Sequence, residues 1–195
     1  MYYICFMDRL ITHIRKTVNL DDSEAAIVSS YFEYETVKKK KHLVEEGQTV
    51  HKQYYILKGC LRIYTLNTKG NEQTLQFGIE NWWIADYLGF LGQTPSNYFI
   101  QAVENSEVIS IDKNSLDELL SQLPKLEKYF RLTFQKSLGA AQMRIKYLFT
   151  MTAEESYHHF NKNFPEFVQR VPQYMLATYL DFTPEFMSKI RAGKT

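Results

Sequence analysis

The hydrophobic positions between residues 34 and 112 follow a short, strand-like pattern. Runs rich in β-branched and aromatic residues alternate with turn-forming residues, as is typical of β-strands. The runs cover residues 54–57, 61–64, 74–77, 98–100 and 108–111. Lys58-Gly59 separates two of them closely, and residues 67–71 join two others as a hairpin would. Strands this short and evenly spaced predict a barrel or jelly roll.

After residue 112 the hydrophobic period becomes helical. A short amphipathic helix ends at Pro124, and a longer one follows with apolar residues spaced by threes and fours. These apolar residues are Leu126, Phe130, Phe134, Leu138, Ala141, Ile145 and Leu148. A helix of this kind is roughly 35 Å long at about 1.5 Å per residue. Because such a stripe requires a partner, we expect dimerisation with a second copy. A core helix of a monomer is the alternative.

The C-terminal segment carries the start signals of further helices. Thr152 and Glu155 have the spacing of a capping box, which predicts a helix from that point. Two later helices, at residues 173–180 and 184–192, are separated by a tight turn. Thr183 as N-cap and Pro184 at the first helical position mark the start of the last one. The pair predicts a helix-turn-helix, with Ala177 at the helix crossing and Met187 and Ile190 facing inward.

The outward face of the last helix carries side chains that bind DNA in other proteins. Lys, Ser and Glu reach base edges, and Arg reaches bases or phosphates. We expect Ser188 and Lys189 to read bases and Glu185 to bond a cytosine amine or orient Lys189. The residues expected to hold phosphates are Thr183, Arg191 and Lys194. An ordinary helical corner with a solvated face is the alternative interpretation.

Composition limits the class of protein. The 195 residues have a net charge of +1, which argues against a protein that coats nucleic-acid backbones. Two cysteines, Cys5 and Cys60, cannot build a disulfide framework, so a reducing, cytoplasmic setting is expected. No apolar run approaches the ~20 residues of a membrane span. The N-terminal segment is a poor signal peptide, because Asp8 and Arg9 interrupt it.

A β-roll, a long helix and a terminal helix-turn-helix, in that order, resemble the Crp/Fnr family of bacterial transcription regulators. The most telling stretches are residues 55–64, 70–74, 172–180 and 182–191, and the last is similar to the recognition helix of a Bacteroidetes-type branch. The resemblance implies an α+β fold with an N-terminal double-stranded β-helix (jelly-roll) domain like that of cyclic-nucleotide binders. It also implies a homodimer that binds DNA, with RNA polymerase and an unidentified small-molecule effector as further partners.

The same resemblance divides the chain into three parts. We expect a sensor domain over residues 1–123, a dimerisation helix over residues 124–150 and a helix-turn-helix domain over residues 151–195. If the sensor domain holds a ligand, its site is expected at the positions where the family's cyclic-nucleotide binders carry their phosphate-binding cassette, here residues 83–87 and 96–102. The residues expected to line that site are Trp83, Asp86, Tyr87, Ser96 and Asn97.

The sequence departs from the family's cyclic-nucleotide binders at this site. Those proteins neutralise the cyclic phosphate with a helix N-terminus and an Arg, and they hold the ribose with the Glu of a Gly-Glu pair. Here Ala85-Asp86 replaces Gly-Glu, and residues 96–102 contain no Arg. A buried phosphate without a cation is costly, so we expect no cyclic AMP binding by the usual chemistry.

We expect neither a cofactor nor a metal ion. An iron–sulfur cluster needs four thiolates, and the chain has two cysteines. His158 and His159 are adjacent, so on a helix they point to different faces and are not expected to chelate a metal ion together.

In the helix-turn-helix, Asp181 stands where Gly is usual in the family, and Asp tolerates the left-handed backbone that the turn requires.

Two other classes of function compete with a DNA-binding regulator. A cupin-type enzyme would need a His-x-His metal motif, which the chain lacks, so we expect no enzyme. An effector-binding or interaction module of the same fold that has lost DNA binding is the closer alternative, because the net charge is near zero and the turn is substituted.

Overall fold

The computed structural model describes the backbone of residues 2–192 and the side chains of residues 6–190 and 192. The described residues pack as two compact units. The first contains the residues up to 63 together with residues 77–134. The second contains residues 64–76, which form a hairpin, together with the residues from 135 onward.

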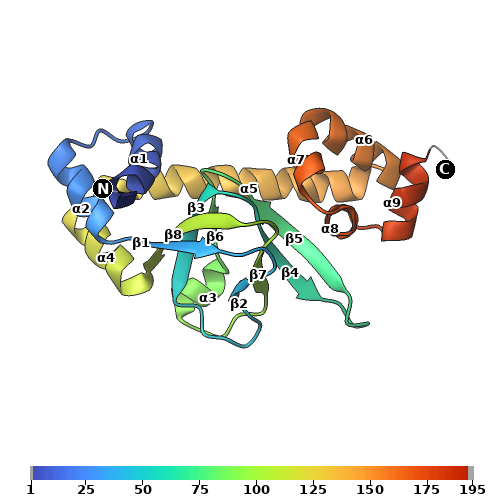
Figure 1. The fold of residues 1–195 in the computed structure, drawn as a ribbon, viewed down its shortest axis with the longest axis horizontal. Helices are drawn as coiled ribbons and strands as arrows, with labels where there is room; N and C mark the ends of the chain where they lie inside the picture. The colour runs from blue at the N-terminus through green and yellow to red at the C-terminus, as the bar shows by residue number, and fades with distance from the viewer. Residues whose placement is uncertain (1, 193–195) are drawn as a thin grey trace. The chain divides into compact units, whose positions relative to one another are not determined.

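The strands form two four-stranded sheets, in the orders β1-β8-β3-β6 and β2-β7-β4-β5. The pairings of the first sheet are antiparallel, with Tyr54 of β3 opposite Ser110 of β8. This arrangement is the double-stranded β-helix that the sequence predicts, and its strands are labelled in Figure 1. The strands are β1 (Glu33–Val37), β2 (His42–Val44), β3 (Lys52–Lys58), β4 (Leu61–Leu66), β5 (Glu72–Gly78), β6 (Trp83–Ile84), β7 (Phe99–Ala102) and β8 (Ser106–Asp112).

Five helices accompany the roll in the chain: α1 (Tyr2–Arg15), α2 (Asp22–Ser30), α3 (Tyr87–Gly92), α4 (Lys113–Gln122) and α5 (Leu126–Thr150). Leu10 and Ile14 of α1 join the apolar core of the first unit, together with Ile56 and Ile109 from the strands. The sequence pattern did not predict α1 or α2, since their apolar residues precede the strand-like region. Both helices are part of the folded first unit.

The remaining helices belong to the second unit: α6 (Ala153–Asn163), α7 (Pro165–Arg170), α8 (Gln173–Tyr179) and α9 (Pro184–Arg191). The capping box predicted at Thr152 is confirmed, because its side chain accepts from Glu155 N and Glu155 accepts from Thr152 N. Residues 165–170 are helical, so no β-hairpin wing lies directly before α8. The two sheets and the helices around and after them confirm the α+β class expected from the sequence.

Candidate nucleic-acid interface

The turn between α8 and α9 has the geometry of a Schellman motif. Phe182 N donates to Ala177 O at 3.0 Å, and Asp181 N donates to Thr178 O at 3.3 Å. Asp181 takes the left-handed conformation with φ of 65°. The sequence-based expectation for this residue is therefore confirmed, and the substituted turn retains the geometry that Gly usually supplies.

The start of α9 follows the sequence signals closely. The Thr183 side chain accepts from Phe186 N at 3.2 Å, and Pro184 occupies the first turn. Met187 and Ile190 are buried together with Ala177, as predicted, so α9 packs on α8 through one apolar face. Thr183 Oγ1 accepts this bond and the residue is exposed, so its hydroxyl proton is still a possible donor.

The predicted base-reading residues lie on the opposite face of α9. Glu185, Ser188 and Lys189 are all exposed. Ser188 Oγ donates to Pro184 O at 3.1 Å within the helix. The Arg191 side chain and the whole of Lys194 lie outside the described residues. The structure therefore brings Glu185, Ser188 and Lys189 together on one solvated helix surface.

A hairpin from the roll contacts the first helix of this pair. The hydroxyl groups of Thr178 on α8 and Thr74 on β5 form a 3.0 Å hydrogen bond, and Thr74 N donates to Thr178 Oγ1 at 3.3 Å. The Gln73 side chain donates to the Thr178 carbonyl. No local sequence pattern predicts these contacts, because they join residues about a hundred positions apart. They fix the hairpin of β4 and β5 to the helix-turn-helix within the second unit.

The predicted dimerisation stripe divides into a buried and an exposed part. Leu126 and Phe130 are buried in the core of the first unit, and Phe134 is half-buried against Tyr87, with ring centroids 5.1 Å apart. Leu126 and Phe130 thus pack inside their own chain, which corrects the expectation that they contact a second copy. Leu138 is 61% exposed and Ile145 is 52% exposed, and Ala141 and Leu148 are exposed as well.

At the predicted ligand site, two of the polar residues bind each other. Asp86 caps the N-terminus of α3, where its Oδ1 accepts from Gly89 N at 3.0 Å. Ser96 Oγ donates to Asp86 Oδ2 at 2.9 Å and accepts from Tyr98 N at 3.0 Å. Both residues are buried. The Asp86 carboxylate therefore has its hydrogen-bond partners within the protein itself, at the N-terminus of α3.

The other residues predicted for this site do not form one lining. Trp83 is buried, and its Nε1 donates to the Tyr129 hydroxyl at 2.9 Å. Tyr87 packs against Phe134, and burial raises the pKa of its hydroxyl. Asn97 is exposed. The structure joins Asp86 to Ser96 and gives Trp83 a separate role in the aromatic core.

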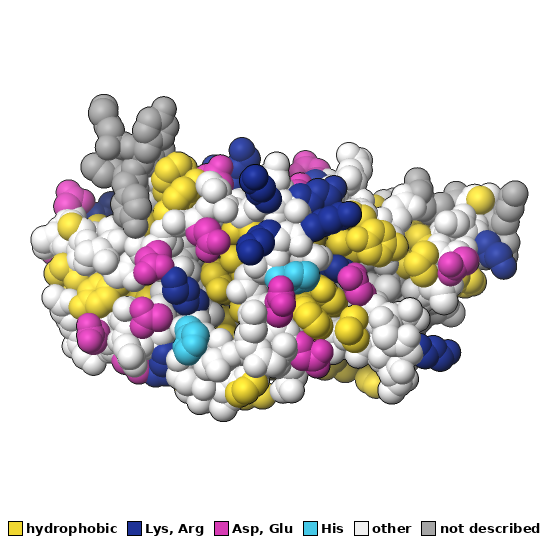
Figure 2. Space-filling view, turned by 60° about the horizontal axis from the view of Figure 1, so that its bottom comes forward, with side chains coloured by type: hydrophobic (Ala, Val, Ile, Leu, Met, Phe, Trp, Pro, Cys, Tyr) yellow, Lys and Arg dark blue, Asp and Glu magenta, His cyan; other side chains and the backbone are white. Residues whose placement is uncertain are grey.

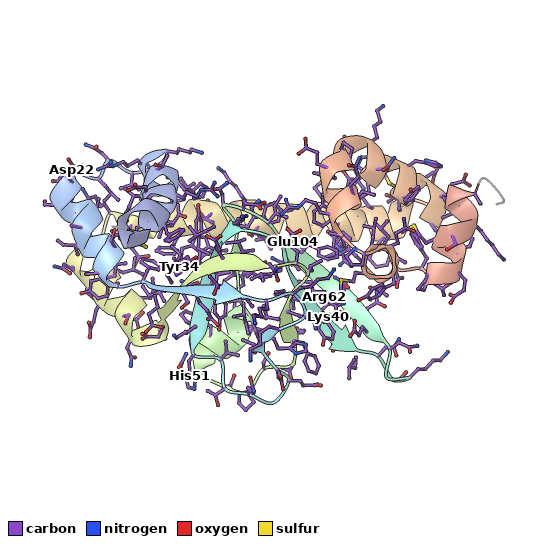
Figure 3. All side chains as sticks on the ribbon, viewed as in Figure 1. Asp22, Tyr34, Lys40, His51, Arg62 and Glu104 are labelled. Atoms are coloured by element: carbon purple, nitrogen blue, oxygen red, sulfur yellow. The ribbon has the colours of Figure 1, made fainter. Side chains whose placement is uncertain are left out.

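Sequence reasoning missed a buried polar network inside the roll, around Arg62, which is labelled in Figure 3. Arg62 on β4 is only 1% exposed, and its Nε and Nη2 donate to Gln101 Oε1 at 3.0 and 2.6 Å. Gln101 Nε2 in turn donates to the Lys40 carbonyl at 3.2 Å and lies 3.1 Å from His42 Nε2. An Arg in the middle of an otherwise apolar strand was the available signal.

Two kinds of site are absent from the described residues, a cluster of metal-ligating side chains and a membrane-spanning helix. Among the described residues, no group of three or more His, Cys, Asp and Glu could hold a metal ion. Within the same part of the chain, no helix is long and apolar enough to cross a bilayer. Figure 2 shows a face on which Lys and Arg side chains lie among Asp and Glu, in keeping with the net charge of +1.

Comparisons with known proteins agree with this architecture. Residues 34–123 match the family model of the cyclic nucleotide-binding domain. The chain is 26% identical to the anaerobic regulatory protein of Haemophilus influenzae, over 79% of this chain and 63% of that protein. It is 27% identical to electron transport regulator A of Shewanella oneidensis, over 79% of this chain and 65% of that protein. The chain thus spans less than two thirds of the length of either relative.

A similar fold occurs among solved structures. FixK2 from Bradyrhizobium japonicum superposes with a TM-score of 0.71 at 16% identity, over 83% of each chain. At that identity the likeness concerns the fold, which includes both the roll and the helices that follow it.

Proposed function

Since the chain belongs to the Crp/Fnr family, we propose that it is a DNA-binding transcriptional regulator that acts as a homodimer with α9 in the major groove. The observation that carries this proposal is the intact helix-turn-helix, with a Schellman turn at Asp181 and a polar outer face on α9. Lys189 and Ser188 would read bases, and Glu185 would bond a cytosine amine or orient Lys189. Thr183, Arg191 and Lys194 would hold phosphates.

The homodimer would form along α5. Its exposed apolar residues Leu138, Ala141, Ile145 and Leu148 are spaced by three, four and three, which is the spacing of a coiled-coil seam. Two copies place two recognition helices on one DNA molecule and double the small basic excess of the C-terminal segment. RNA polymerase would be a further partner, and the cytoplasm, where bacterial DNA lies, the setting.

We also propose that the roll does not bind cyclic AMP by the usual chemistry. The Asp86 carboxylate lies at the N-terminus of α3 and is hydrogen-bonded by Ser96, so a phosphate there would face a like charge. Residues 96–102 supply no Arg to offset it. The roll would therefore respond to a different effector or serve as a structural platform.

Binding to the protein's own promoter DNA tests the proposal. Fluorescence anisotropy at several salt concentrations should show specific binding with a shallow salt slope, because few phosphate contacts are expected. Lys189→Ala should weaken specific binding by about 1–3 kcal/mol if this residue reads a base. Lys162→Ala, an exposed lysine on α6, is the matched control and should change affinity little.

The outcomes separate the two candidate functions. Promoter binding that salt weakens and that Lys189→Ala impairs supports the regulator. If the wild-type protein shows no salt-sensitive DNA binding, the proposal of a DNA-binding regulator is wrong. The alternative, an interaction module of the same fold, is then favoured.

A further inference from the structure

A polar pocket lies between α1 and the roll, apart from the site around Asp86. It has a volume of about 210 Å³ and opens to solvent. Its lining residues are Asp8, Arg9, Thr12, His13, Lys16 and Asn81. Typical pockets for drug-sized ligands hold about 300–1,000 Å³, so this one suits a smaller molecule.

The C-terminal half of α1 and the residue after it supply most of the pocket's charge. Arg9 and His13 are four positions apart on the helix, and Lys16 directly follows its last residue, Arg15. Asp8 is the one acidic side chain of the lining. Arg9 and Lys16 against Asp8 give the pocket a net positive charge. Arg9 is held in place because its Nη1 donates to the Leu57 carbonyl.

The roll supplies a positioned amide on the opposite wall. Asn81 takes a left-handed backbone with φ of 70°, and its N donates to Ile56 O at 2.8 Å. The Tyr55 hydroxyl donates to Asn81 Oδ1 at 3.1 Å. Because its oxygen accepts this bond, the side-chain nitrogen of Asn81 is the atom that remains to donate toward the pocket.

His13 links the pocket to the long helix. Its Nδ1 lies 2.8 Å from the hydroxyl of Tyr129 on α5, and the same hydroxyl accepts from Trp83 Nε1 at 2.9 Å. Indole nitrogen only donates, so the Tyr129 oxygen accepts the bond from Trp83. One hydroxyl of α5 therefore contacts both the pocket residue His13 and the buried Trp83.

We propose that this pocket binds a small anion with a carboxylate or phosphate group. Arg9 and Lys16 would neutralise its charge, while the Asn81 side-chain nitrogen would donate a hydrogen bond to its oxygens. Asp8 lowers the affinity and limits the charge that the pocket accepts. His13 lines the pocket and lies 2.8 Å from the Tyr129 hydroxyl, so one side chain connects the pocket to α5.

Calorimetric titration of the full chain at low salt tests the site with two probes, inorganic phosphate and succinate. Saturable binding of either one supports the proposal, and the better-bound probe identifies the group that the pocket prefers. The measurement needs no DNA, so it fails or succeeds independently of the proposed regulatory function. No saturable binding of either probe overturns the site.

Charge variants locate the binding within the protein. Lys16→Ala and Arg9→Gln should each weaken binding about threefold, and Asp8→Asn should strengthen it by a similar factor, as one solvent-screened charge allows. Lys128→Ala removes an exposed lysine of α5 outside the pocket and should leave binding unchanged. Equal losses in Lys16→Ala and Lys128→Ala would mean non-specific attraction and would overturn the site.

A ring-nitrogen NMR spectrum of the histidines gives a readout that a change in stability would not produce. Because His13 lines the pocket, saturating probe should shift its ring-nitrogen signals. An unchanged His13 signal at saturation would place the anion elsewhere.

Discussion

The Arg144 guanidinium of α5 holds the end of α8 in two ways. Its Nη2 donates to the Tyr179 carbonyl at 2.9 Å, and its Cζ lies 4.5 Å from the centroid of the Tyr179 ring. Tyr179 is the last residue of α8, two positions before the left-handed Asp181. One side chain thereby connects the long helix to the turn that leads into α9.

Replacing Arg144 should therefore loosen the helix-turn-helix. Arg144→Ala should cost about 1–3 kcal/mol, through the lost hydrogen bond and the lost stacking on the ring. Amide hydrogen exchange across α8 and α9 should become faster, and DNA affinity should fall with it. Lys146→Ala, an exposed neighbour on α5, is the control. Equal exchange rates in the two variants would show that the contact contributes nothing.

The left-handed residue of the turn predicts an asymmetric response to substitution. Asp181→Gly should leave stability unchanged or raise it by up to about 1 kcal/mol, because Gly adopts this backbone without steric cost. Asp181→Val should lower stability by about 1–2 kcal/mol, since a β-branched side chain disfavours the left-handed region. Urea unfolding followed by circular dichroism measures both, and a more stable Val variant would contradict the observed turn.

The bond between Ser96 and Asp86 should stabilise the roll. Ser96→Ala removes the donor to a buried carboxylate and should cost about 1–3 kcal/mol in the free energy of unfolding. The exposed Ser30 also donates a side-chain hydrogen bond, to Ile27 O at 2.8 Å. Ser30→Ala should therefore change stability by less than about 0.5 kcal/mol. If the two variants unfold at the same urea concentration, the buried pair is not a stabilising one.

The exposed half of the apolar stripe on α5 can be tested by its effect on mass. Leu138→Glu combined with Ile145→Glu places two like charges on the seam of each copy, so the protein should sediment as a monomer. Lys146→Glu changes an exposed charge on the same helix and should leave the dimer intact. A wild-type protein that already sediments as a monomer would refute the homodimer.

Local signals in the sequence determined the elements that depend on neighbours in the chain. The strand runs, the stripe of α5, the capping box at Thr152 and the N-cap at Thr183 all follow from residues within one or two turns of each other. The left-handed turn at Asp181 also belongs to this group, because the end of α8 requires that backbone locally and Asp tolerates it. Together these local features predict the order of the elements, a β-roll followed by a long helix and a helix-turn-helix.

Only the tertiary structure decided which distant residues meet. Thr74 and Thr178 are 104 positions apart, and Arg144 and Tyr179 are 35 apart, so no local pattern could pair them. The burial of Leu126 and Phe130 and the pocket beneath α1 have the same origin. A periodic stripe of apolar residues indicates that one face of a helix is apolar. The packing of the whole chain determines whether that face is buried in the core of the same chain or left exposed.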